Sequence, residues 1–467
     1  MPDDTTNLLR AALAMMLALC IGANLRLRAG PWRYFNSLNI LLACYCYYCL
    51  IGPLALSILG AGVFDNQDLL VYADDATLST ILSLATLFCG YVIGAWGSLS
   101  PKLTAGIHFH SKPQHLNWHS IFALVLLGLA LFFGLWGHGF RIQKFLNPFG
   151  ADLTYAGTLG ESTGSVYGSS LYNYLFGSIS FMITSCAVIV GAWRLGRANI
   201  WVVVGASTLT CVVFLTSGFR LRLVVLIISL LSVHSLVTGR RPSLLILTAV
   251  AIGSFVLMGL IGLTRVYGEG IDASAVSKVA WDRLLISMFG DSSTFYTMGY
   301  VMHYVREEGI MTWLDPLWGA LARPIPLTVF GAKYYSMTNS IIADSFGTSG
   351  AYGSGFAIPF FGEYFIALRW WGVGLGSFGV GWLFGAGDRK LLTKSGDLMG
   401  VVAYSVWVAF SFIFFHRGYL AQTLEYLVFV MAPSILALWL GKQALPDVAK
   451  PAERQTSNRE IRRGHRR

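Results

Sequence analysis

About eleven apolar runs divide this sequence, and each is long enough to cross a lipid bilayer as a helix. An α-helix rises about 1.5 Å per residue, so the roughly 30 Å of hydrocarbon in a bilayer requires about 20 apolar residues. Only 12% of the residues are charged, whereas soluble proteins carry about 25%. The sequence therefore predicts an all-α, polytopic integral membrane protein, with spans near residues 8–25, 37–60, 78–98, 118–137, 171–193, 200–217, 222–238, 243–263, 369–387, 398–415 and 420–440.

The charges in the connectors between these runs indicate which side of the membrane each connector faces. Short connectors rich in Lys and Arg face the cytoplasm, and those of this chain are RLRAGPWR, RLGRAN, GRRPS and GDRKLLTK. The alternation places the N-terminus outside and the C-terminus inside, and it accounts for the net charge of +10 without a nucleic-acid partner. The expected regions are helices one to eight in 1–263, a large extracytoplasmic loop in 264–358, helices nine to eleven in 359–441, and a basic cytoplasmic tail in 442–467.

The expected loop is long enough to suggest a function of its own. In its first part, Val276, Ala280, Leu284 and Met288 recur on one helical face, so a helix is predicted there. Two prolines favour an extended conformation in the second part, RPIPLTVFGAKYYSMTNS. The Gly- and Ser-rich stretch that follows, SFGTSGAYGSG, is typical of a flexible segment.

Two other patterns are better explained by packing than by chemistry. The run GLGSFG matches a dinucleotide-binding pattern, but it lies inside an apolar run and not between a strand and a helix. The pairs Gly372/Gly376 and Gly381/Gly385 instead have the spacing that lets membrane helices approach closely. All seven Cys fall inside predicted spans and are interpreted as small apolar residues. We therefore expect neither a metal site nor a cofactor.

Arginine on the outer side is the stronger signal, because the positive-inside rule makes it uncommon there. Four arginines come from distant parts of the sequence but are expected at one depth: Arg220, Arg265, Arg369 and Arg417. They could simply extend to lipid headgroups. Alternatively they form a cationic pocket, because a guanidinium binds phosphate oxygens through two parallel N–H···O bonds and stays charged at any pH.

Two residues on the same side are candidates for a general base. Glu363 is an acid in an otherwise apolar segment, and an acid within the membrane is a functional candidate by default. His303, in GYVMHYVRE, is the second candidate. Each has a structural alternative, which is a helix-packing hydrogen bond for Glu363 and a packed surface position for His303.

Three segments around these residues resemble the bacterial O-antigen polymerases, within the broader group of oligosaccharide repeat-unit polymerases. The segments are LTSGFRLRLVVLIISLL, GSGFAIPFFGEYFIALRWWGVGLGSFGVGWLFG and FFHRGYLAQTLEYL, and the resemblance extends over roughly residues 200–440. Arg220 matches the family's turn arginine, Glu363 its loop-end glutamate and Arg417 its Arg-Gly pair, while Arg265 has a less distinctive counterpart. The sequence HRGY departs from the family, in which a small or acidic residue follows the glycine.

The resemblance implies a membrane-embedded glycosyltransferase that needs no metal and no cofactor. The growing glycan on a polyprenyl pyrophosphate would be transferred to a single lipid-linked repeat unit, on the periplasmic face of a bacterial inner membrane. The N-terminus would then be periplasmic and the product an O-antigen or an exopolysaccharide. Glu363, His303 and Arg220 would be catalytic, and the pyrophosphate would be held by Arg220, Arg265, Arg369 and Arg417. A flippase and a chain-length regulator would be partners, in addition to membrane lipid.

Three alternatives remain open from the sequence. A ligase that joins a finished glycan to another acceptor would share the donor site. A flippase or exporter would move the lipid-linked glycan without chemistry, and it would need charges along a path through several spans. A membrane scaffold without a substrate would leave the outer arginines unexplained.

Overall fold

The computed structural model describes most of the membrane-spanning part of the chain. The described residues are 4–27, 32, 34–59, 63–64, 67–97, 116–137, 140, 142, 177–216, 220–266, 270–271, 280–322, 337–346, 358–395 and 397–443. The predicted flexible stretch SFGTSGAYGSG lies almost entirely outside them, and the basic tail lies outside them except for its first two residues.

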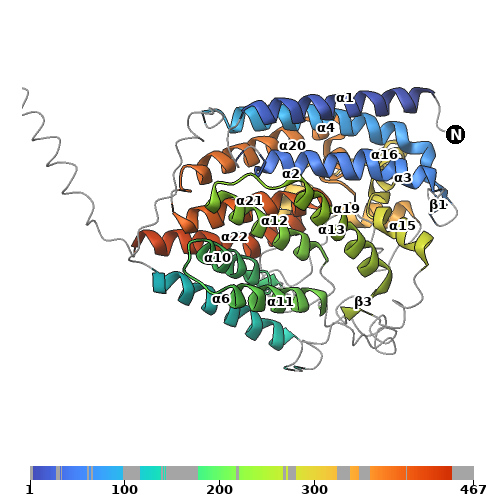
Figure 1. The fold of residues 1–467 in the computed structure, drawn as a ribbon. Coiled ribbons are helices and arrows are strands. Elements are labelled where there is room, and N and C mark those ends of the chain that lie inside the picture. Colours follow the sequence, from blue (N-terminus) through green and yellow to red (C-terminus); the bar gives the residue numbers. More distant parts are fainter. Residues whose placement is uncertain are drawn as a thin grey trace, which may run out of the picture.

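The described residues form a bundle of long helices that run roughly side by side (Figure 1). Within the described part of the chain, eight helices are long and apolar enough to cross a membrane, so the chain is a polytopic α-helical membrane protein. Each of the eleven predicted runs overlaps a helix or a pair of helices, although residues 171–176 of the fifth run lie outside the described residues. These helices are α1 (Asp4–Leu27), α2 with α3 (Ser37–Cys46, Gly52–Ile58), α4 (Ala73–Gly94), α6 (Leu116–Gly137), α10 (Phe181–Arg194), α11 (Ile200–Thr216), α12 (Arg220–Thr238), α13 (Leu244–Thr264), α20 (Phe360–Leu392), α21 (Leu398–Arg417) and α22 (Leu420–Gln443).

Three of these eleven elements, α10, α11 and α20, are not among the eight candidate spans. The helices α10 and α11 are apolar but shorter, and α20 contains a kink. A π-helical turn, η2 (Tyr47–Ile51), joins α2 to α3 into one candidate span. The helix α20 also extends to Leu392, so much of the predicted connector GDRKLLTK is helical.

The described residues of the expected loop between α13 and α20 form four further helices. Those labelled in Figure 1, α15, α16 and α19, lie at one end of the bundle, which we call the loop end. The helical pattern of its first part resolves into α15 (Trp281–Gly290) and α16 (Ser293–Glu307). They are followed by α17 (Asp315–Ala322) and α19 (Met337–Ser345). The extended conformation predicted up to residue 340 is wrong from Met337 onward, where α19 begins. Two short antiparallel pairs of strands also occur among the described residues. The strands β1 (Val63–Phe64) and β2 (Gln67–Asp68) lie between α3 and α4, and β3 (Arg265–Val266) and β4 (Gly270–Ile271) follow α13.

The helix α21 lies in the centre of the bundle, where 94% of its apolar window is buried. It packs against α2, α10, α12, α20 and α22. Its N-terminus is capped by the Asp397 side chain, which accepts the backbone N–H of Gly400 at 2.7 Å. Because α21 is surrounded by protein, its two ends are well placed to hold functional turns in fixed positions.

The helices α4 and α20 pack closely against each other, because glycines on both lie at the contact. A Cβ at Gly90 or Gly94 would overlap backbone atoms of Phe378 and Trp382 in α20. A Cβ at Gly381 would overlap the carbonyl of Leu87, and one at Gly385 that of Tyr91. The two small-residue pairs interlock, which confirms the packing interpretation of Gly381 and Gly385.

We expect Gly381→Ala to lower the stability of the bundle, by about 1–3 kcal/mol, because its methyl group has no space beside Leu87. Gly379→Ala in the same helix is the matched control, since no atom lies within 4 Å of a Cβ there. Thermal unfolding in detergent micelles measures both variants. Equal unfolding temperatures would contradict the close α4–α20 contact.

Candidate functional site

Glu363 lies in the first two turns of α20, at the loop end, and its side chain is completely buried. Its Oε2 accepts the backbone N–H of Leu420 at 2.7 Å, so the carboxylate caps the N-terminus of α22 from a distant part of the chain. The Thr338 hydroxyl of α19 donates a long hydrogen bond of 3.5 Å to Oε1. Removing a carboxylate from water is costly unless it is hydrogen-bonded, and these two donors compensate part of that cost.

The turn between α21 and α22 brings Arg417 to the same place. Arg417 is the last residue of α21, and Gly418 follows with φ of 59°. A side chain at Gly418 would overlap the carbonyl oxygen of Ile358, so only glycine allows this turn to contact the start of α20. The start of α20, which contains Glu363, therefore lies against the backbone of the turn that follows Arg417. Both residues were predicted site residues.

The structure places the backbone of two other predicted arginines but does not describe their side chains. Arg220 is the first residue of α12, and Arg265 begins β3 opposite Ile271. The side chain of Arg417 also lies outside the described part of the chain. The predicted convergence of four guanidinium groups therefore stays a prediction.

Arg369, the fourth predicted arginine, lies at the kink of α20 with φ of 57° and ψ of −143°. This left-handed conformation is unfavourable for any residue with a Cβ. One guanidinium nitrogen, Nη2, donates to the carbonyl of Val305 at 2.8 Å, and the group lies 5.6 Å from the ring centre of Phe365. The second terminal nitrogen, Nη1, is buried and has no hydrogen-bond partner among the described residues. Arg369 thus combines backbone strain with an unsatisfied cationic donor, a combination typical of functional positions.

A comparison of Arg369→Gly with Arg369→Ala isolates this strain, because both variants lose the same side-chain contacts. We expect the glycine variant to be more stable by about 1–3 kcal/mol. At the exposed, helical Trp371, two residues later, the same pair of substitutions should give the opposite order, with alanine favoured by about 1 kcal/mol. The measurement is the unfolding temperature of the four variants. A higher unfolding temperature for the alanine variant at both positions would show that the backbone at Arg369 is not strained.

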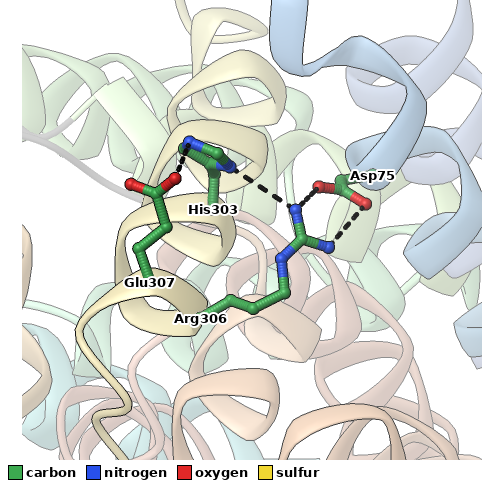
Figure 2. A network of polar contacts seen from close by, with 4 residues as sticks. All are labelled: Asp75, His303, Arg306 and Glu307. Carbon is green, nitrogen blue, oxygen red and sulfur yellow. Dashed lines mark hydrogen bonds and ion pairs between the residues drawn. The ribbon is translucent and has the colours of Figure 1, made fainter.

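His303 belongs to a polar network that joins α16 to α4 (Figure 2). Its Nε2 lies 3.1 Å from Glu307 Oε1, and its Nδ1 lies 3.4 Å from Nη2 of Arg306. Arg306 in turn binds Asp75 at 2.8 Å. A neutral imidazole that accepts from Arg306 and donates to Glu307 has no lone pair left for a substrate hydroxyl. His303 would have to release Arg306 before it could act as a base.

Sequence reasoning missed Arg222, which is buried in α12 with only 3% of its surface exposed. Its guanidinium carbon lies 5.9 Å from the ring centre of Tyr426 in α22. Glu425, next to Tyr426, is a further half-buried charge within that candidate span. The available signal was the second arginine of RLR, which lies inside the apolar run and is costly there.

His416, beside Arg417, has a structural role. Its Nδ1 lies 2.7 Å from the hydroxyl of Tyr48, and its ring stacks on Phe412. Among the residues that the structure describes, no group of three His, Cys, Asp or Glu side chains lies close enough to hold a metal ion.

Comparisons with protein-family models, with curated proteins and with solved structures give no match to this chain.

Proposed function

We propose that this protein is a membrane glycosyltransferase that polymerises polyprenyl-pyrophosphate-linked oligosaccharide repeat units at the outer face of the bacterial inner membrane. The observation that carries the proposal is the contact, at the loop end, between the buried Glu363 carboxylate and the turn that follows Arg417. These residues lie far apart in sequence, and both belong to the segments that resemble O-antigen polymerases. Arg222 and Arg369 add two cationic groups at the same end of the bundle.

In the proposed reaction, Glu363 accepts a proton from the acceptor hydroxyl of a lipid-linked repeat unit. The hydroxyl oxygen forms a bond to the anomeric carbon of the growing glycan, and the bond from that carbon to the pyrophosphate oxygen breaks. Polyprenyl pyrophosphate leaves with the bonding electron pair. Arg220, Arg265, Arg369 and Arg417 would stabilise its developing negative charge, and each such interaction typically contributes a factor of about 10²–10³ in rate.

The direct test uses the purified protein in nanodiscs, supplied with a chemically defined lipid-linked repeat unit. A ladder of products that differ by one repeat supports the proposal, and the ladder should persist in the presence of a metal chelator. A single transfer to a different acceptor, with no ladder, would instead identify a ligase. Movement of the substrate across a vesicle membrane without any new glycosidic bond would refute enzymatic activity and identify a flippase.

A further inference from the structure

The helix α17 lies in the expected extracytoplasmic loop, yet its exposed face is apolar. The exposed fractions are 66% for Leu314, 51% for Leu317, 59% for Trp318 and 57% for Leu321. Leu314 directly precedes α17, and its carbonyl accepts the backbone N–H of Trp318 at 2.9 Å. The four residues therefore follow the i, i+3, i+4, i+7 spacing of a single helical stripe. In a water-exposed helix such a stripe would face the protein core.

The inward face of α17 contains small residues instead. Pro316, Gly319 and Ala320 are buried, and α17 packs against α22, which is a candidate membrane span. A helix that packs closely against other helices in lipid has small residues on the side that faces the protein and large apolar residues on the outward side. The surface of α22 likewise exposes Val428, Ile435 and Leu436, so the two helices share one apolar environment.

A second helix of the same loop repeats the arrangement. The helix α15 exposes Trp281, Leu285 and Ile286 and packs against the candidate span α13. The Ser287 hydroxyl donates to the carbonyl of Gly259 at 2.8 Å, several residues before the end of that span. The helix α15 therefore packs along the side of a membrane span and not only across its end.

We propose that α17 lies within the outer leaflet of the bilayer, with Leu314, Leu317, Trp318 and Leu321 in contact with phospholipid hydrocarbon chains. Tryptophan at the edge of such a face is typical of the membrane interface. The helix α17 is also connected to Glu363 through two hydrogen bonds. The carboxylate of Asp315 accepts the backbone N–H of Met337 at 3.0 Å, and the hydroxyl of the next residue, Thr338, donates to Glu363. The immersion of α17 does not depend on the proposed enzymatic activity.

The test is site-specific photo-crosslinking of the full-length protein in phospholipid vesicles, with p-benzoyl-phenylalanine introduced at Leu317. Leu436 in α22 is the lipid-facing reference, and the exposed, charged Glu308 at the end of α16 is the aqueous reference. Mass spectrometry of the irradiated protein identifies what is attached. All three positions are exposed, so none of these substitutions should disturb the core.

We expect phospholipid adducts at Leu317 and Leu436 in similar yield, and at least about tenfold fewer at Glu308. An adduct yield at Leu317 as low as that at Glu308 would overturn the proposal. A crosslinked dimer at Leu317 would overturn it as well, because a second copy of the chain would then cover the face. Loss of polymerase activity in a variant that keeps its lipid adducts would leave the immersion of α17 intact.

Discussion

Glu363→Gln is expected to stop polymer formation while the protein remains folded. Glutamine keeps a carbonyl oxygen that can accept the N–H of Leu420, so the cap of α22 persists. It cannot accept a proton from a sugar hydroxyl, and the loss of a general base typically costs a factor of about 10²–10⁴ in rate. The measurement is the yield of the product ladder per mole of folded protein, with folding checked by thermal unfolding.

Two variants separate this chemical role from a structural one. Glu363→Ala should lose both the ladder and about 1 kcal/mol of stability, because it leaves the N–H of Leu420 without its acceptor. Asp397→Asn is the matched control, since Asp397 also caps a helix with its carboxylate, but at the N-terminus of α21. Asp397→Asn should retain the ladder. Wild-type rates in Glu363→Gln would leave Glu363 as a helix cap alone.

The sequence predicted the helical membrane architecture well, because long apolar runs are determined by the thickness of the bilayer. It could not predict the kink in α20, since neither Leu368 nor Arg369 is a residue that breaks helices. The kink depends on a distant segment: the backbone N–H groups of Thr312 and Trp313 donate to the carbonyls of Ile366 and Ala367. These bonds satisfy the end of the first helical segment, and such partners are not visible in local sequence.

Buried charges were the other limit of the sequence reasoning. GDRKLLTK was interpreted as a cationic connector, but Asp388 within it is completely buried in α20. Its carboxylate accepts the hydroxyl groups of Ser37 and Tyr91 and so joins α2 and α4 to α20. Arg222, the first residue of the predicted span 222–238, was likewise not marked as a buried charge, yet only 3% of its surface is exposed. A single sequence marks where charges occur, but it does not show which of them the fold surrounds.

Glu363 shows the opposite case, in which the sequence was informative. An acid within an apolar segment at the membrane face was marked as a candidate, and the structure buries it against the turn after Arg417. The second candidate base, His303, lies in a separate network with Arg306 and Glu307. The buried acid could be singled out from the sequence, whereas the partners of its side chain and of His303 depend on the packing of α16 and α20.

Arg220→Ala should give a cell that makes single repeat units but no polymer. If Arg220, at the start of α12, holds the donor pyrophosphate, its removal weakens leaving-group stabilisation by a factor of about 10²–10³. Arg220→Lys should recover only part of the activity, because an ammonium group lacks the bidentate geometry of guanidinium. The glycan chain-length distribution on gels measures both variants.

Arg283→Ala provides the control for a change of charge on the same expected side of the membrane. Arg283 lies in α15, is exposed and does not belong to the proposed pyrophosphate site. Its replacement should leave chain lengths unchanged, so a defect confined to Arg220 would indicate a specific interaction and not a general loss of positive charge. Normal chain lengths in Arg220→Ala would rule out the proposed pocket, because the leaving group would then be stabilised without the arginine that is expected both to be catalytic and to bind the pyrophosphate.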